Sequence, residues 1–340
     1  MAAPGLFLAF LLLLLGGGPG LGRGCEDDGG DGDDVLPVVQ PELTRSELGC
    51  GRPQAPGLSR NVGGEDAGPG EWPWQGSLLR RGTHVCGASL IAPRWVLTAA
   101  HCFQESQEPG DYAVLLGVRE LAGPPGPGVA VPLGRVLPHP AYAGEATSGD
   151  IALAQLARPV AFSAAVLPVC LPGPALRFAP GTRCVATGWG DIKEGEDLPS
   201  PRRLQKLEVP IMAQATCRRL YGTDMGRELP PRRIQDDMMC AGYPEGLKDT
   251  CKGDSGGPLV CRAGGRWVLA GIVSWGEGCA VPKRPGVYTR VSAYAPWIAR
   301  RVPGLPFVTA AAAAACTCAA CAAPVACAAA LLLLLALLGP

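Results

Sequence analysis

Apolar residues in the middle of the chain occur only in short runs, such as Val96 to Ala100 and Gly271 to Ser274. Glycine and proline, with 48 and 35 residues, interrupt the sequence between such runs. Short apolar runs bounded by turn-forming residues are typical of short β-strands. The sequence therefore predicts an all-β protein with many short strands and no long helices. Its 340 residues allow two domains, or one all-β unit of about 200 to 250 residues with flanking segments.

The overall charge is balanced, with 30 Lys and Arg residues against 30 Asp and Glu residues. This balance gives no reason to expect nucleic acid as a partner, so any selection of ligands by charge must be local. The chain has three histidines, His84, His101 and His139, and none stands at a metal-ligand spacing from another histidine or cysteine. We expect neither a metal site nor a cofactor.

One serine stands among glycines in the motif Cys251-Lys252-Gly253-Asp254-Ser255-Gly256-Gly257-Pro258, where the backbone is free to turn sharply. A serine hydroxyl is a weak nucleophile unless a base and a group that orients the base lie close to it. His101 in Thr98-Ala99-Ala100-His101-Cys102 and Asp150 in Asp150-Ile151-Ala152-Leu153 supply these groups. Taken singly, the serine and the aspartate are typical turn residues and the histidine is typical of a structural role. Their order along the chain, His, Asp and Ser, favours nucleophilic catalysis.

These motifs resemble those of trypsin-like serine proteases of the chymotrypsin clan, and the resemblance extends from about Cys50 to Arg301. The run Leu207 to Ile211 is similar to membrane-anchored tryptase-like and prostasin-like enzymes. The resemblance implies two six-stranded antiparallel β-barrels with the active site in the cleft between them. It also implies that Ser255 is the nucleophile, His101 the general base and Asp150 the group that orients His101. The amides of Gly253 and Ser255 would form the oxyanion hole.

The resemblance places Asp249 at the base of the primary specificity pocket, where a buried carboxylate would bind Arg or Lys at P1, the residue before the scissile bond. We therefore expect an endopeptidase whose partners are protein or peptide substrates with a basic P1 residue, and protein protease inhibitors. A further hypothesis gives Lys252 a preference for acidic residues near the cut and Glu277 a preference for basic residues upstream. The other residues expected to bind substrate are Thr250, Ser274, Trp275, Gly276 and Gly286.

Residues 25–60 resemble the propeptide, or light chain, of two-chain relatives, and residues 61–301 the protease domain. Cleavage of the Arg60–Asn61 bond would free an amine that inserts beside Asp254 and assembles the active pocket. Asn61 departs from the family pattern, which has an apolar β-branched residue at this position. A buried carboxamide without partners costs about 1 to 3 kcal/mol. The alternative is therefore a zymogen-locked or weakly active protease fold that serves as a binding module.

Residues 1–24 are predicted to be a signal peptide, because a short apolar segment precedes a stretch of small residues. The 15 cysteines also suggest passage through an oxidising compartment, so we expect a secreted or cell-surface protein. The sequence alone does not fix how the cysteines pair. The resemblance implies five disulfides: Cys50–Cys170, Cys86–Cys102, Cys184–Cys261, Cys217–Cys240 and Cys251–Cys279.

Residues 302–340 form a hydrophobic tail without a charged side chain. Small residues around Ala315 to Ala320, followed by an apolar end, resemble a signal for a GPI anchor. Pro324 interrupts the apolar stretch and no basic residue follows it, which counts against a spanning helix. We expect this tail to attach the protein to a membrane. A spanning helix and a merely hydrophobic tail on a secreted protein are the alternatives.

Overall fold

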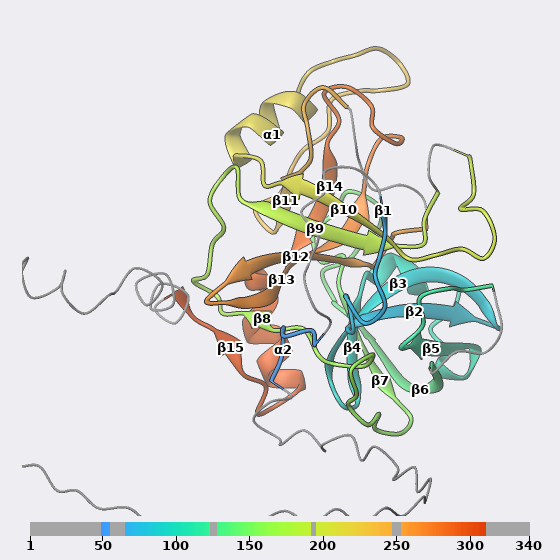
Figure 1. Ribbon diagram of the computed structural model, residues 1–340. Helices are drawn as coiled ribbons and strands as arrows, with labels where there is room; N and C mark the ends of the chain where they lie inside the picture. Colours follow the sequence, from blue (N-terminus) through green and yellow to red (C-terminus); the bar gives the residue numbers. More distant parts are fainter. Residues whose placement is uncertain (1–48, 55–64, 123–127, 192–194, 247–252, 311–340) are drawn as a thin grey trace, which may run out of the picture. The chain divides into compact units, whose positions relative to one another are not determined.

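The computed structural model describes residues 49–54, 65–122, 128–191, 195–246 and 253–310. Within these ranges most of the regular structure is β-strand (Figure 1). Two short α-helices occur there, α1 (Gln214–Tyr221) and α2 (Ala295–Arg301), together with short 3-10 helices. The expectation of many short strands and no long helix is confirmed for the described part of the chain.

The first half of the described chain forms a closed antiparallel barrel with the strand order β2-β3-β4-β7-β6-β5. Burial alternates along β5, where Tyr112, Val114 and Leu116 are buried and the two residues between them are half-buried. This period of two is the pattern of a strand with one face toward a core. The strands are β2 (Gln75–Arg80), β3 (Thr83–Ala92), β4 (Trp95–Thr98), β5 (Tyr112–Leu116), β6 (Val129–Pro138) and β7 (Ala152–Leu156).

The second half, joined by β1 from near the start of the described chain, forms a seven-stranded sheet in the order β1-β10-β9-β12-β13-β14-β11. Six of these strands curl into a second barrel, because Ile211, just after β10, forms an antiparallel bridge with Ala241 of β11. The strands are β1 (Glu65–Asp66), β9 (Arg183–Gly188), β10 (Gln205–Pro210), β11 (Met238–Ala241), β12 (Pro258–Ala263), β13 (Arg266–Trp275) and β14 (Gly286–Arg290). The predicted architecture of two six-stranded antiparallel barrels is confirmed, with β1 as an additional edge strand.

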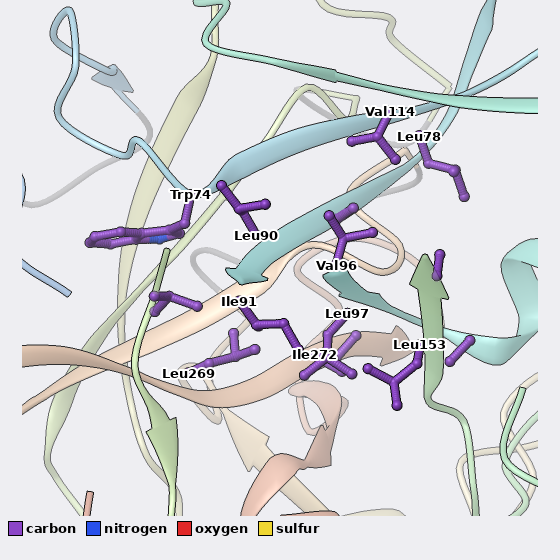
Figure 2. Close-up of a cluster of buried hydrophobic side chains, with 14 of the residues drawn as sticks. Trp74, Leu78, Leu90, Ile91, Val96, Leu97, Val114, Leu153, Leu269 and Ile272 are labelled. Carbon is purple, nitrogen blue, oxygen red and sulfur yellow. The ribbon is translucent and has the colours of Figure 1, made fainter. Parts of the chain in front are cut away.

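One hydrophobic core joins the two barrels. Ile91, Leu97 and Leu153 of the first barrel belong to the same buried cluster as Leu269 and Ile272 of β13 (Figure 2). Burial of large aliphatic side chains stabilises a fold by about 1.5 to 3 kcal/mol each. The packing between the barrels therefore fixes the position of groups that reach the cleft from different barrels.

The last described strand, β15 (Phe307–Val308), pairs in parallel with β8 (Leu171–Pro172). Phe307 and Leu305 pack against the shared core, so packing continues beyond Arg301, where the sequence analysis ends the protease domain. Among the described residues no helix is long and apolar enough to cross a membrane. The predicted signal peptide and most of the predicted hydrophobic tail lie outside the described residues.

Candidate active site

His101 lies in a 3-10 helix (Ala100–Phe103) that follows β4 directly, and it binds Asp150 through two groups. Its backbone N–H donates to Oδ1 of Asp150 at 3.0 Å. Its Nδ1 lies 2.8 Å from Oδ2 of the same carboxylate. A carboxylate oxygen only accepts, so Nδ1 carries the proton and Nε2 of the neutral ring is free to accept one. The ring is thus held in the tautomer that a general base requires.

Asp150 stands just before β7, and its side chain is only 8% exposed. A buried carboxylate needs several hydrogen bonds to offset the loss of hydration. The Ser274 hydroxyl on β13 donates to Oδ2, in addition to the two groups of His101. The Thr289 hydroxyl on β14 donates to the backbone oxygen of Asp150 at 2.7 Å. Strands β13 and β14 of the second barrel therefore hold Asp150 in place, although Asp150 belongs to the first barrel. Ser274 was predicted to bind substrate, and its bond to Asp150 was not predicted.

Ser255 lies in a turn that is fixed between the barrels. Its backbone oxygen accepts from the N–H of Gly87 on β3, and the Gly256 N–H donates to Val273 on β13, both at 2.8 Å. Gly256 has φ 77°, and a Cβ there would lie 2.2 Å from the Thr98 hydroxyl. No residue other than glycine fits such a position. Gly256 is thus required by the close approach of the two barrels.

A cleft of about 420 Å³ brings together many of the predicted site residues. The predicted catalytic residues His101, Asp150 and Ser255 line it. So do four residues predicted to bind substrate, Ser274, Trp275, Gly276 and Gly286. The sequence analysis missed several other lining residues, among them Tyr142, Glu145 and Asp191. Asp249, Thr250 and Lys252 lie outside the described residues, so their predicted roles stay predictions.

Burial and nearby negative charge perturb the phenol of Tyr142, which lines the cleft. Burial is the main cause that raises the pKa of Tyr142 to about 12, and the charges of Asp150 and Glu145 add to it. The Tyr142 hydroxyl accepts a hydrogen bond from the Gln104 side chain at 2.9 Å. The neutral phenol of Tyr142 is therefore a polar but uncharged group in the lining of the cleft that His101 shares.

Gly253, the predicted donor to the oxyanion, is held by a histidine that the sequence analysis did not assign. Nε2 of His84 lies 3.1 Å from the Gly253 carbonyl oxygen. Nδ1 of His84 lies 2.7 Å from the Ser77 hydroxyl. A carbonyl only accepts, so Nε2 is protonated and Nδ1 accepts from Ser77. Burial lowers the pKa of His84, although the bond to Gly253 opposes this effect.

Asp254 precedes the serine, and its Oδ1 accepts from the Gly190 N–H at 2.9 Å. The predicted activation residues Arg60 and Asn61 lie outside the described residues. The structure therefore places the acid toward which a new amine would insert, and the predicted cleavage stays a prediction.

Glu277 follows the cleft wall but does not offer a free charge. Its Oε1 pairs with Nε of Arg232 at 2.9 Å, and its Oε2 pairs with Nε of Arg284 at 2.7 Å. Its side chain is 7% exposed. Two arginines thus neutralise the carboxylate, and this argues against the hypothesis that Glu277 selects basic residues upstream of the cut.

The structure contains four of the disulfides that the resemblance implied: Cys50–Cys170, Cys86–Cys102, Cys184–Cys261 and Cys217–Cys240. The fifth implied pair, Cys251–Cys279, includes a residue outside the described ranges. The disulfide Cys86–Cys102 lies against His101, and the three side chains place possible metal-binding atoms within 4.8 Å of one another. Sulfur atoms joined in a disulfide are not thiolates, so this group does not bind a metal.

Comparisons with known proteins agree with this geometry. Residues 61–298 match the family model described as Trypsin. Transmembrane protease serine 9 of Rattus norvegicus is 47% identical over 255 residues, which cover 74% of this chain and 23% of that protein. The chain thus corresponds to less than a quarter of the length of this relative. It belongs to the family of trypsin-like serine proteases.

Proposed function

We propose that this chain is a serine endopeptidase that cleaves protein or peptide substrates after Arg or Lys. The observation that carries the proposal is the bonded pair of His101 and Asp150 in the same cleft as Ser255. Membership of the trypsin family supports the same reaction class. Because the residues present suffice for acyl transfer, the mechanism needs no metal or cofactor.

In this mechanism Nε2 of His101 takes the proton of the Ser255 hydroxyl as its oxygen attacks the carbonyl carbon of the scissile bond. Asp150 stabilises the imidazolium that forms, through its 2.8 Å contact with Nδ1. His101 then gives the proton to the leaving amine, and water hydrolyses the acyl-enzyme by the same steps in reverse. The amides of Gly253 and Ser255 bind the oxyanion, and each such donor contributes about 2.7 to 4 kcal/mol.

The proposed preference for Arg or Lys rests on Asp249, which precedes Ser255 by six residues in the family motif. An unpaired buried carboxylate is costly, and a basic P1 side chain would satisfy it. Arg would bind by two parallel hydrogen bonds and Lys as a point charge. Gly276 and Gly286 line the cleft without side chains, which is consistent with space for a long P1 residue.

A panel of fluorogenic peptides that differ only at P1 tests this function on protein cleaved after Arg60. We expect turnover of the Arg and Lys peptides, and its loss by about six orders of magnitude in Ser255→Ala. Asp249→Ser should abolish cleavage after basic residues specifically. If Asp249→Ser retains cleavage after Arg, the pocket assignment is wrong. If Ser255→Ala retains full turnover, the assigned nucleophile is wrong.

We further propose that the enzyme is made as a zymogen, with residues 25–60 as light chain and residues 61–301 as protease domain. Cleavage at Arg60–Asn61 would free the amine that joins Asp254. An active-site titrant that forms a covalent bond with a reactive serine tests this step. Labelling of Ser255 only after cleavage at Arg60 supports it. If the cleaved protein is not labelled, the alternative of a binding module, caused by Asn61, is favoured instead.

We propose a location at the cell surface or outside the cell. A signal peptide at residues 1–24 would bring the chain into the oxidising compartment that its four described disulfides require. Residues 302–340 would then attach it to the outer face of a membrane, and the rat relative is named as a transmembrane protease. Phosphatidylinositol-specific phospholipase C on intact cells tests the anchor. Release into the medium supports a GPI anchor, whereas retention at the surface favours a spanning helix.

A further inference from the structure

The described lining of the cleft includes acidic side chains but no Lys or Arg. Asp150 is bound to His101 and Ser274, and Glu277 nearby is paired with two arginines. Glu145 and Asp191 differ from both, because within the described residues neither side chain has an ion pair or a hydrogen bond. A cleft lined by charges of one sign focuses its field and attracts ligands of the opposite sign. Among the described lining residues, these two carboxylates therefore carry the uncompensated charge.

Glu145 is held at the tip of a tight turn between Gly144 and Thr147. The Thr147 hydroxyl donates to the Gly144 carbonyl at 2.6 Å and accepts from the Ala143 N–H at 3.1 Å. The Thr147 N–H donates to the same Gly144 carbonyl at 3.2 Å. Ala146 adopts φ 59°, a conformation uncommon for residues with a side chain. Such strained residues concentrate at ligand sites, where the surrounding bonds fix them. The turn thus presents Glu145 in one defined place.

Glu145 stands on the side of the cleft that Trp275 forms. Ala146, its neighbour, packs against the buried cluster that contains Trp275 and Tyr221. Glu145 and Trp275 line the same cleft. A substrate that adds a strand along Ser274 to Gly276 would extend its residues upstream of P1 past Trp275. Its upstream side chains would then pass within reach of Glu145.

The negative charge of Glu145 acts inside the cleft and not only at its rim. It contributes to the raised pKa of Tyr142, together with burial and the charge of Asp150. Because Tyr142 lines the cleft beside His101, the carboxylate of Glu145 is close enough to act on groups bound there. The exposed carboxylate also has room to rearrange around a cation.

We propose that Glu145 is a specificity-determining residue that binds a Lys or Arg side chain at one of the positions P2 to P4. This inference rests on the proposed cleavage after Arg or Lys and narrows its substrate class to segments with at least two basic residues. The carboxylate that selects a basic substrate residue upstream of P1 is then that of Glu145 in the turn 144–147, and not that of Glu277. Lys and Arg both fit, because a single exposed carboxylate attracts either cation.

Peptides with Arg at P1 and Lys, Gln or Glu at P2, P3 or P4 test the proposal on protein cleaved after Arg60. We expect one of the three positions to give a higher kcat/KM with Lys than with Gln. Glu145→Gln should lower this ratio about threefold, as expected for an exposed ion pair. Glu145→Lys should invert the preference, so that Glu at that position becomes better than Lys. Raising the salt concentration from about 50 mM to about 500 mM should weaken the preference of the wild type.

Glu108→Gln is the matched control, because it removes the same charge from an exposed residue that does not line the cleft. Its ratio of Lys to Gln peptides should equal that of the wild type. If the wild type cleaves no peptide after Arg, the proposed function itself fails. If the wild type cleaves all peptides regardless of upstream charge, or if Glu145→Gln keeps the full preference, only the role of Glu145 is overturned.

Discussion

Nε of Arg284 lies 2.7 Å from Oε2 of Glu277, and the side chains of the two residues are 0% and 7% exposed. The remaining nitrogens of Arg284 bind backbone carbonyls in the last turn of α1 and in the segment that follows this helix. Nη1 donates to Leu220 at 2.7 Å, and Nη2 donates to Thr223 at 2.9 Å and to Leu229 at 3.0 Å. The buried guanidinium of Arg284 therefore joins this segment to Glu277, which directly follows the cleft-lining residues Trp275 and Gly276.

We expect Arg284→Ala to lower the free energy of unfolding by about 3 to 5 kcal/mol, because it breaks a buried ion pair and leaves carbonyls without donors. Denaturant titration at pH 7 measures this change. Arg219→Ala is the control, since Arg219 is exposed and its side chain has no ion pair within the described residues. The control should stay within about 0.5 kcal/mol of the wild type. A loss below about 1 kcal/mol in Arg284→Ala would contradict a structural role for this pair.

The burial of His84 should make stability depend on pH. The pKa of His84 is lowered in the fold by burial, below its ordinary value of about 6.5 in the unfolded chain. The unfolded state therefore binds the proton more tightly. The contribution of His84 is fully present above about pH 6.5 and is lost as the pH falls through the lower folded-state value. Protonation would also turn Nδ1 into a donor, so the Ser77 hydroxyl would have to rotate and accept the bond that it now donates.

His84→Gln is the test, because an amide can donate to Gly253 and accept from Ser77 without titrating. Free energies of unfolding are measured for both proteins from pH 7.5 to pH 5. We expect the advantage of the wild type to shrink as the pH falls. His139, whose pKa is also lowered mainly by burial, is present in both proteins and cancels in the difference. If the difference in free energy of unfolding between the wild type and His84→Gln does not change with pH, His84 is not the cause of the pH dependence.

Short apolar runs and turn residues were enough to predict short strands, and the family resemblance carried by the motifs predicted the two barrels and the residues of the candidate site. Ser255 and its flanking glycines form a motif that is contiguous in the sequence, and His101 directly follows a predicted strand. The role of Arg284 could not be predicted, because Lys283-Arg284 between two prolines is typical of a solvated loop. Its burial depends on carbonyls of residues 55 to 64 positions away in the sequence.

The same limit explains why Glu145 was missed. Gly144-Glu145-Ala146-Thr147 is typical of an exposed loop, and nothing within it shows that it borders Trp275. That relationship arises only when the two barrels pack, since residue 145 belongs to one barrel and residue 275 to the other. The sequence also favoured Glu277 as a free charge, because its partners Arg232 and Arg284 are not adjacent to it in the chain.

Asp237 holds the turn that precedes Asp150, and we expect its removal to slow catalysis. Its carboxylate accepts from the Ser148 hydroxyl at 2.8 Å, from the Gly149 N–H at 3.0 Å and from the Tyr294 hydroxyl. Without these bonds the turn is free to move, and Asp150 no longer fixes His101 in one place. A displacement of about 1 Å in a catalytic group can cost about a hundredfold in rate.

Asp237→Ala should therefore lower kcat about tenfold or more and change KM much less, because the P1 pocket is not touched. Asp236→Ala is the matched control, since this neighbouring side chain is 98% exposed and, within the described part of the chain, pairs only with Arg218 at the surface. Steady-state kinetics with the best Arg peptide measure both constants. An effect confined to KM, or equal effects of the two variants, would show that Asp237 does not position the catalytic acid.

The disulfide Cys50–Cys170 should keep the light chain attached after the proposed cleavage at Arg60. It joins residues 120 positions apart, and the backbone of Gly51 adds bonds to Pro168 at 2.8 Å and to Trp267 at 2.9 Å. On a denaturing gel the cleaved protein should migrate as one species without reductant and as two species with reductant.

The double variant Cys50→Ser, Cys170→Ser leaves no lone thiol, and its two chains should separate on the gel without reductant. In the uncleaved chain we expect it to lose about 2 to 5 kcal/mol of stability, through the greater freedom of its unfolded state. Two species from the cleaved wild type without reductant would show that this bond does not form in the protein.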